Sequence, residues 1–348
     1  MTRWLITGGC GFIGCNLVRH LLAEGGHSIR VLDNLETGGP ERLAALAPLH
    51  DFPGGADALG GSGGGVELVV GDVLDQELVH LSARGRDVLV HLAANTGVGP
   101  SVEDPRRDCM ANVIGTLNCL DAARHGGVRR FVFASSNAPL GAVEPPVHEE
   151  TAPRPASPYG VSKLAGEGYC SAYWQSFGLE TVALRFGNVY GPGSDRKSSL
   201  VAAFIRRGLA GQPLEVFGDG NQTRDFIFVD DLVQAVVKAA KVPGIGGEIF
   251  QIATARETTV AEVARLVADA MTEAGLRSVA MRHVAPRVGD ARRSYANTTK
   301  AERLLGWRAS TPLEEGVRQV MRWFQERSAD AAAPARYGRI AQAAPLSP

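Results

Sequence analysis

Short apolar runs alternate with longer amphipathic stretches along most of the chain. The runs with the composition of strands are residues 3–7, 27–32, 66–70, 88–92, 131–134 and 181–186. Segments with a helical pattern lie between them, including 108–124 and 159–177. Because strands alternate with helices, the pattern predicts an α/β fold with a Rossmann-type, doubly wound parallel sheet.

Length and local composition suggest how this fold is divided. The chain has 348 residues, of which 45% are hydrophobic, enough for one large domain and a smaller C-terminal lobe. We expect a Rossmann domain over residues 1–186, rejoined by about 225–250, and a substrate-binding lobe over 187–325. The glycine-rich stretch 52–65 reads as a surface insertion, and residues 326–348 read as a loose tail rich in Ala and Pro.

Charge and cysteine content exclude several function classes. A formal net charge of −1 without a basic block argues against a nucleic-acid partner. Five cysteines without a C-x-x-C pair, and eight histidines without ligand spacing, lead us to expect reduced thiols and no metal site. We find no long apolar run or signal-peptide pattern, so we expect no membrane association and a cytoplasmic location.

A glycine-rich turn follows the first apolar run directly. Gly9, Gly11 and Gly14 have the spacing G-x-G-x-x-G, and the next residues read as a helix. Glycines at this spacing allow a tight turn, close approach of a pyrophosphate, and packing of the helix on the strand. The positive end of the helix dipole would face the phosphates. The cofactor contacts expected here are Gly8, Gly11, Phe12, Ile13 and Gly14.

Polar residues at the ends of later strands extend this dinucleotide site. Asp33 ends the second apolar run, 19 residues after Gly14, where a carboxylate binds the adenosine ribose and favours NAD over NADP. Ligands of such sheets bind at the carboxyl ends of the strands. The residues expected to line the cofactor cleft are therefore Asp33, Asn34, Asp72, Val73, Leu92, Ala93 and Ala94.

A tyrosine and a lysine stand four residues apart where the helical segment 159–177 begins. Tyr159 and Lys163 would share one face of that helix, although the same spacing also occurs as surface decoration. We expect the nearby ammonium to lower the pKa of the phenol from about 10. Such a phenol could exchange a proton with a substrate hydroxyl. The dinucleotide site favours the catalytic interpretation, because a dinucleotide bound there could accept a hydride while the phenol removes the proton.

The order of these motifs resembles the extended short-chain dehydrogenase/reductase family, most closely its nucleotide-sugar epimerases of the UDP-glucose 4-epimerase type. The residues that carry the resemblance are Thr7 to Gly14, Gly71-Asp72, His91 to Ala94, Asn112, Ser135-Ser136, Tyr159, Lys163 and Arg224 to Phe226. The resemblance implies NAD as cofactor, with Lys163 on the nicotinamide ribose, Asn112 facing the active site and Ser135 beside the cofactor. It makes Ser136, Tyr159 and Lys163 the catalytic residues, with Ser136 bonding the substrate O4.

The resemblance also assigns the substrate side. Asn188 would contact the sugar diphosphate, Ser199 and Leu200 the nucleoside, and Val216 with Phe217 the base. Arg224 and Arg287 would bind the diphosphate, a task suited to guanidinium groups, and Asp290 the nucleotide ribose. A nucleotide sugar, most simply a UDP-hexose, is therefore the expected substrate, and a homodimer through segments 108–124 and 159–177 the expected assembly.

The residues after Ser136 narrow the implied reaction. The related 4,6-dehydratases carry Asp-Glu there, whereas this chain has Asn137 and Ala138, which cannot act as acid or base at neutral pH. We therefore expect epimerisation at C4 through a 4-keto intermediate. The alternatives are a UDP-glucuronate 4-epimerase using Arg196 or Lys197, a nucleotide-sugar 4-ketoreductase or dehydratase, and a non-catalytic NAD-binding regulator. The small Ser294 would admit larger sugars, and the sequence leaves both sugar and nucleotide open.

Overall fold

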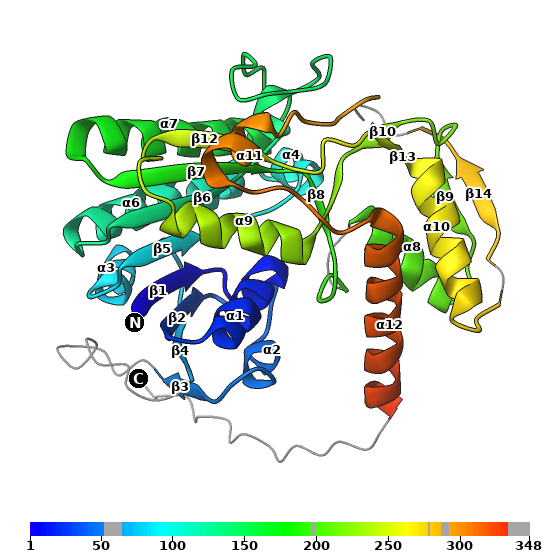
Figure 1. Ribbon diagram of the computed structural model, residues 1–348, viewed down its shortest axis with the longest axis horizontal. Helices are drawn as coiled ribbons and strands as arrows, with labels where there is room; N and C mark the ends of the chain where they lie inside the picture. The colour runs from blue at the N-terminus through cyan, green and yellow to red at the C-terminus, as the bar shows by residue number, and fades with distance from the viewer. Residues whose placement is uncertain (52–64, 196–198, 278, 287–291, 333–348) are drawn as a thin grey trace.

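A parallel sheet forms the centre of the larger part of the protein (Figure 1). The computed structural model describes residues 1–51, 65–195, 199–277, 279–286 and 292–332. Within these residues eight strands pair in the order β12-β7-β6-β5-β1-β2-β4-β3. Their bounds are β1 (Thr2–Thr7), β2 (His27–Asp33), β3 (Leu49–Asp51), β4 (Val66–Val70), β5 (Val88–His91), β6 (Arg130–Ser136), β7 (Glu180–Phe186) and β12 (Glu248–Ile252). The predicted doubly wound sheet is confirmed.

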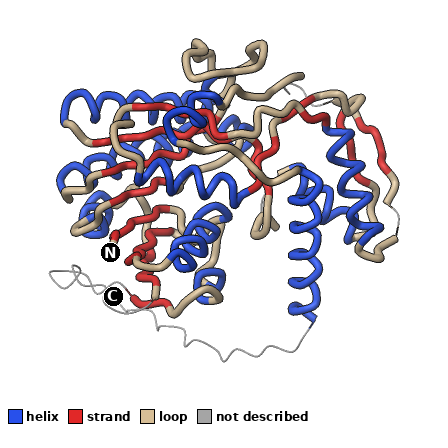
Figure 2. Tube along the Cα trace, viewed as in Figure 1, coloured by secondary structure: helices blue, strands red, loops and turns tan. Residues whose placement is uncertain are grey.

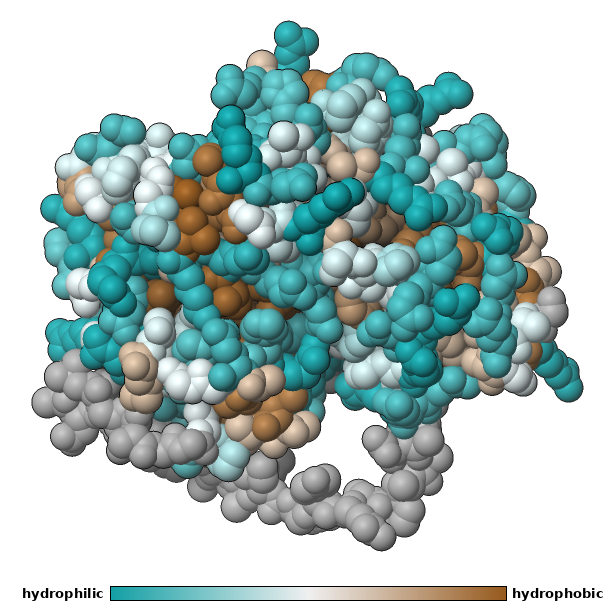
Figure 3. All heavy atoms as spheres, in the orientation of Figure 1, coloured by the Kyte–Doolittle hydropathy of each residue, from teal (hydrophilic) through white to brown (hydrophobic). Residues whose placement is uncertain are grey.

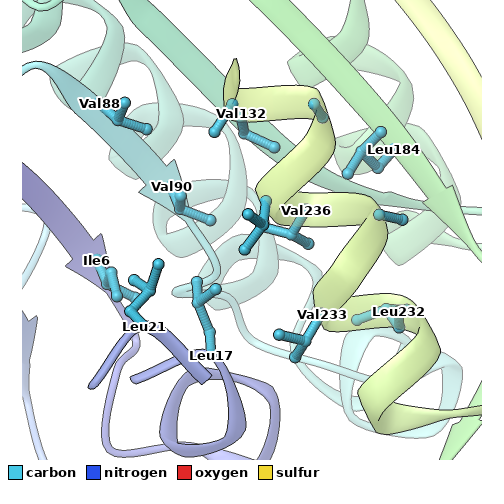
Figure 4. Packing of buried hydrophobic residues seen from close by; sticks show 14 of the residues in the cluster. Ile6, Leu17, Leu21, Val88, Val90, Val132, Leu184, Leu232, Val233 and Val236 are labelled. Atoms are coloured by element: carbon cyan, nitrogen blue, oxygen red, sulfur yellow. The ribbon is translucent and has the colours of Figure 1, made fainter. Parts of the chain in front are cut away.

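Helices cover both faces of the sheet (Figure 2). One face carries α1 (Phe12–Glu24), α2 (Glu41–Ala44), α9 (Val229–Lys241) and α11 (Thr299–Leu305). The other carries α3 (Gln76–Ala83), α6 (Gly115–His125) and α7 (Pro158–Phe177). Side chains of a strand alternate between the faces, so Trp4 and Ile6 of β1 enter the first core while Leu5 enters the second. Figure 4 shows Leu17 and Leu21 of α1 facing the same core as Val236 of α9.

A smaller lobe with its own core follows β7. Its strands are β8 (Asn188–Tyr190), β9 (Leu214–Phe217), β10 (Thr223–Arg224), β11 (Phe226–Phe228), β13 (Thr258–Thr259) and β14 (Met281–Val284). Its helices are α8 (Leu200–Leu209), α10 (Val260–Glu273) and α12 (Leu313–Ala332), which stand beside the sheet domain in Figure 1. The lobe core gathers buried residues from all three helices, among them Phe204, Val267 and Val320.

The chain does not divide at one point between these two parts. Helix α9 and strand β12 return to the sheet, in the range of about 225–250 that we expected to rejoin it. Helix α11 packs beside them, although it falls within the residues that we assigned to the lobe. Helix α12 runs to Ala332, so the segment expected as a tail from residue 326 begins as helix. The hydrophobic face of α12 explains this extension, because Val317, Val320 and Phe324 are buried in the lobe core.

The chain leading into α6 forms several short helical elements, whereas we expected a single helix over residues 108–124. These elements are α4 (Val98–Glu103), α5 (Pro105–Cys109) and one π-helical turn, η2 (Met110–Ile114), that leads into α6.

Hydrophilic residues cover most of the face drawn in Figure 3. In the described part of the chain, none of the helices has the length and apolar character needed to span a membrane.

Candidate active site

The crossover of the sheet lies at β1, which pairs with β2 on one side and β5 on the other. The chain leaves β1 in one direction to build β2, β4 and β3, then crosses over to β5. Connections on opposite sides open a crevice at the carboxyl ends of the two strands, the usual ligand site of such sheets. The residues that follow β1, β2, β4, β5 and β6 therefore meet at one edge.

The turn from β1 to α1 requires its glycines. Gly8 has a φ of 71°, and a Cβ added there would lie 2.7 Å from the amide nitrogen of Ala93. A Cβ on Gly14 would lie 2.5 Å from the carbonyl oxygen of Gly8. Gly11 is the N-cap of α1, and neither a side-chain cap nor an acidic residue occupies its first turn. The first amides of α1, including those of Phe12 and Ile13, thus suit a phosphate group.

The ends of β2 and β4 place three polar side chains next to this turn. Asp33 Oδ2 accepts the Cys10 amide at 2.9 Å, and Oδ1 accepts the Leu35 amide at 2.8 Å. Burial raises the pKa of Asp33, while these two bonds oppose that effect. Asn34 Nδ2 donates to Asp72 Oδ2 at 2.8 Å. The structure therefore brings the predicted Asp33, Asn34 and Asp72 together, directly beside the glycine turn.

The residues after β5 are held against the same turn. The amide of Leu92 donates to the Thr7 carbonyl at 3.1 Å, and that of Ala93 to the Thr7 hydroxyl at 3.3 Å. His91 is buried and lies 2.7 Å from the same hydroxyl, and burial lowers its pKa to about 3. Leu92, Ala93 and the following Ala94 are partly exposed at the crevice. Their contact with a cofactor stays a prediction.

The side chain of Asn112 is enclosed by hydrogen bonds that the sequence did not show. Its side chain is 1% exposed and exchanges two hydrogen bonds with the backbone of Asn95, at 2.8 and 2.9 Å. Its amide nitrogen also lies 2.9 Å from Asp108 Oδ1 and 3.2 Å from Ser162 Oγ. A side chain so enclosed is poorly placed for direct cofactor contact. It holds the loop after β5 to α7, and the π turn η2 brings it there.

Tyr159, Lys163 and Ser136 meet where β6 ends. Ser157 caps α7 through its hydroxyl, which accepts the Gly160 amide at 3.2 Å, so the helix begins immediately before Tyr159. The phenol is hydrogen-bonded to Ser136. The Lys163 ammonium donates to the Ala134 carbonyl at 2.9 Å and lies 5.9 Å from the centre of the Tyr159 ring.

Burial dominates the protonation of this pair. It raises the pKa of Tyr159 to about 12, against the opposing bond from Ser136. Burial also lowers the pKa of Lys163 to about 8. Our expectation of a lowered tyrosine pKa was therefore wrong for the protein alone, because desolvation disfavours the phenolate and the ammonium contacts strand β6 instead.

Ser135 faces a buried ion pair. Its hydroxyl donates to Glu167 Oε1 at 2.6 Å, and Arg185 donates to both oxygens of the same carboxylate, at 2.8 and 2.7 Å. The Ser135 residue is 3% exposed. The hydroxyl of Ser135 is therefore already hydrogen-bonded within the protein. The predicted contact of Ser135 with the cofactor would have to be made by its backbone.

The substrate-side predictions have different outcomes. Val216 is fully buried in the lobe core, so the prediction that its side chain contacts the base was wrong; Phe217, next along β9, is partly exposed. Asn188 is exposed at the start of β8, where its amide donates to the Asp225 carbonyl at 2.8 Å. Ser199 is the N-cap of α8 without a cap bond, and its hydroxyl has no partner in the described part of the chain.

For the remaining predicted substrate-side residues the structure shows few contacts or none. Leu200, the first residue of α8, is partly exposed, and Arg224 of β10 donates to the Thr223 carbonyl at 2.6 Å. Asp225 beside it is buried and accepts the Thr254 amide and hydroxyl, at 2.8 and 2.6 Å, which fixes the entry to the lobe. Arg196, Lys197, Arg287 and Asp290 lie outside the described residues.

Three buried charges near the site were not predicted. Asp108 on α5 influences both Tyr159 and Lys163 electrostatically, and Glu167 and Arg185 form the pair beneath Ser135. Helical spacing could have indicated two of them. Asp108 precedes Asn112 by four residues, and Glu167 follows Lys163 by four, which places each on the face of a predicted site residue.

The fold is that of the short-chain dehydrogenase/reductase epimerases. The profile of the NAD dependent epimerase/dehydratase family matches residues 4–253. The chain therefore belongs to that family, whose cofactor is NAD, and the resemblance seen in the sequence is confirmed.

Known relatives and solved structures match this chain over nearly its whole length. UDP-glucose 4-epimerase of Mycolicibacterium smegmatis is 38% identical, covering 94% of this chain and 99% of that protein. The structure of Thermus thermophilus UDP-glucose 4-epimerase in complex with NAD is 36% identical, with a TM-score of 0.79 over 93% of this chain and 99% of that one. The Thermotoga maritima enzyme with UDP-glucose is 33% identical, with a TM-score of 0.82 over 94% and 100%.

The family also includes other reactions. A dTDP-glucose 4,6-dehydratase of Streptomyces niveus is 30% identical, covering 94% of each chain. A UDP-glucuronate 4-epimerase of Thermodesulfobacterium geofontis is 28% identical, covering 94% of this chain and 97% of that protein. Family membership alone therefore does not select the reaction.

Proposed function

We propose that the protein interconverts the C4 epimers of a nucleotide-activated sugar, a UDP-hexose in the simplest case, through a 4-keto intermediate. The observation that carries this proposal is the contact of Tyr159 with Ser136 and the position of Lys163, all at the carboxyl end of β6 beside the glycine turn. The residues that follow Ser136 offer no further acid or base. The geometry thus supports oxidation and reduction at one carbon.

The described residues fit NAD as the cofactor. Gly8, Gly14 and the uncapped start of α1 leave room for a pyrophosphate, and Asp33 stands where an adenosine ribose would lie. A bound NAD would supply the hydride acceptor and donor that oxidation and reduction at C4 require.

The chain's own residues handle the proton. In this proposal Ser136 bonds the O4 hydroxyl, and Tyr159 takes its proton and later gives it back. Only the phenolate can accept this proton; burial disfavours that form and the Ser136 bond favours it, so the phenol must release its own proton once before the first cycle. Lys163, held on the Ala134 carbonyl, adds a positive charge beneath the reacting atoms. Because the same tyrosine accepts and returns one proton, turnover needs no net exchange with solvent.

Dehydration is the less favoured reaction for this site. Elimination across C5 and C6 needs an acid and a base beside those two carbons, and Asn137 and Ala138 supply neither. The Asn137 Oδ1 atom is buried and has no partner in the described part of the chain. A neutral amide at this place can bind a hydroxyl without transferring a proton to it.

The proposal is tested with purified protein and a panel of UDP-hexoses, UDP-N-acetylhexosamines and UDP-uronates followed by NMR. We expect C4 epimers without added cofactor, and about one NAD per chain released on denaturation. Tyr159→Phe should reduce turnover by at least about 100-fold while NAD stays bound. Products dehydrated at C5 and C6, or stoichiometric cofactor consumption, would instead identify a dehydratase or a ketoreductase.

We also propose a homodimer through the face formed by α4, η2 and α7. Large apolar side chains are exposed on these neighbouring elements, namely Val98, Val102, Met110, Ile114 and Val161. Such a set of exposed apolar residues is typical of a surface covered by a partner. The active site lies at the start of α7, so a dimer would also hold that helix in place.

A further inference from the structure

Three side chains on one face of α7 contact three consecutive residues of β6. Tyr159, Lys163 and Glu167 follow one another at intervals of four and so lie along one stripe of the helix. Tyr159 bonds to Ser136, Lys163 to the Ala134 carbonyl, and Glu167 to the Ser135 hydroxyl. The first two contacts belong to the proposed catalytic group, and the third lies directly behind it.

The third contact is the most strongly constrained of the three. Glu167 and Arg185 side chains are 2% and 3% exposed, and their two-point contact fixes the plane of the carboxylate. Ser135 and Arg185 are register partners on neighbouring strands β6 and β7. Arg185 also donates to the Glu149 carbonyl at 3.3 Å. One carboxylate thus joins the helix to two strands at the level of the catalytic serine.

Stability alone is a weak reason for such a pair. Two buried charges lose their hydration, and apolar residues of similar size often stabilise a core as well or better. The pair fixes geometry instead, because Glu167 can satisfy Ser135 and Arg185 together only at one rotation and height of α7.

We propose that Glu167 is a positioning residue for the proton transfer, acting through Ser135 to set the distance between Ser136 and Tyr159. This inference rests on the proposed function of those two residues. Removing the Ser135 hydroxyl would leave β6 and α7 folded but free to shift, and sub-ångström shifts in a reacting pair reduce turnover strongly. Substrate binding depends on other residues and should change little.

The test compares Ser135→Ala with Thr181→Val. Thr181 donates a buried hydroxyl to the Cys170 carbonyl at 2.7 Å, so its loss removes another bond between the sheet and α7, one turn beyond Glu167. We expect Ser135→Ala to lower kcat about tenfold with KM within twofold, and Thr181→Val to change neither. Equal losses of kcat in both variants would overturn the proposal, because they would reflect general loosening of α7.

A second measurement does not depend on the substrate. With 3-fluorotyrosine at position 159, the 19F resonance reports the surroundings of that ring in the holoenzyme. Ser135→Ala should shift this resonance, and Thr181→Val should leave it unchanged. An unchanged resonance in Ser135→Ala contradicts the positioning role even if the panel of sugars yields no product, whereas a failed panel with a shifted resonance contradicts only the proposed function. Glu167→Gln, which leaves Arg185 without its counter-charge, should shift the resonance further if it folds.

Discussion

The Lys163 ammonium donates to the Ala134 carbonyl at 2.9 Å, from a side chain almost completely removed from water. This bond fixes the cation on β6, the strand that also carries Ser136, with the ammonium 5.9 Å from the centre of the Tyr159 ring. The position costs stability, because burial of the charge lowers the pKa of Lys163 from 10.5 to about 8.

Lys163→Met should therefore make the protein more stable and inactive. At pH 7 we expect the free energy of unfolding to rise by about 1–3 kcal/mol, since the variant no longer buries a cation. The unfolded chain holds this proton up to about pH 10.5 and the folded protein to about pH 8, so the wild type regains stability between these values. Denaturant titrations at pH 7 and 10 should show the gap closing. A similar gain from Lys238→Met, on the sheet face away from the site, would contradict this explanation.

Asp108→Asn should move the pH profile of kcat/KM to lower pH. Burial is the main cause of the shifted pKa values of Tyr159 and Lys163, and Asp108 raises both. Removing its charge should lower both values, so the rising and falling limbs shift together, by about 0.5–1 pH unit. Asn keeps an oxygen for the bond from Asn112. The control is Asp104→Asn, which changes an exposed charge at the N-cap of the same helix; an equal shift there would exclude a specific effect of Asp108.

Gly14→Ala should weaken cofactor binding before it unfolds the protein. An added methyl group would lie 2.5 Å from both the Gly8 oxygen and the Gly9 Cα, so the turn must open. We expect NAD affinity to fall at least about tenfold and the free energy of unfolding to fall by about 1–3 kcal/mol. Calorimetric titration of the stripped protein measures the first effect. Gly99→Ala, where an added Cβ meets no atom within 4 Å, should bind NAD as the wild type does.

Val161→Arg should dissociate the proposed dimer. Val161 is 53% exposed on α7, and an arginine there would place an unpaired charge within the apolar face. Sedimentation should show dimers weakened by at least about 100-fold. Met281→Arg serves as the control, because Met281 is 45% exposed on β14 of the lobe. Monomeric wild-type protein would contradict the proposal outright.

Those parts of the fold and site that depend on local pattern were predictable from the sequence. The strands, the glycine turn and the Tyr159–Lys163 face follow from residue spacing within single elements. Residue spacing did not predict the enclosed side chain of Asn112, because its position depends on a π-helical turn for which the segment carries no sequence signal. Val216 fails for a different reason: strand alternation decides which neighbour is buried, and the phase of a four-residue strand cannot be read without its lobe.

Protonation was equally dependent on tertiary structure. The sequence places a cation four residues from a phenol, and from that spacing a lowered tyrosine pKa follows. The structure adds burial and directs the cation to Ala134, which reverses the sign. The pair of Glu167 and Arg185 joins residues from a helix and a strand, and neither residue carried a signal until their shared contact with Ser135 was visible.

A UDP-hexose carrying deuterium at C4 tests transient oxidation at that carbon most directly. We expect the C4 epimer to form with the label retained at C4 and with no hydrogen from solvent at any sugar carbon, because hydride leaves and returns within one bound complex. Loss of the label to solvent, or its appearance at another carbon, would contradict transient oxidation at C4 and with it the proposed function.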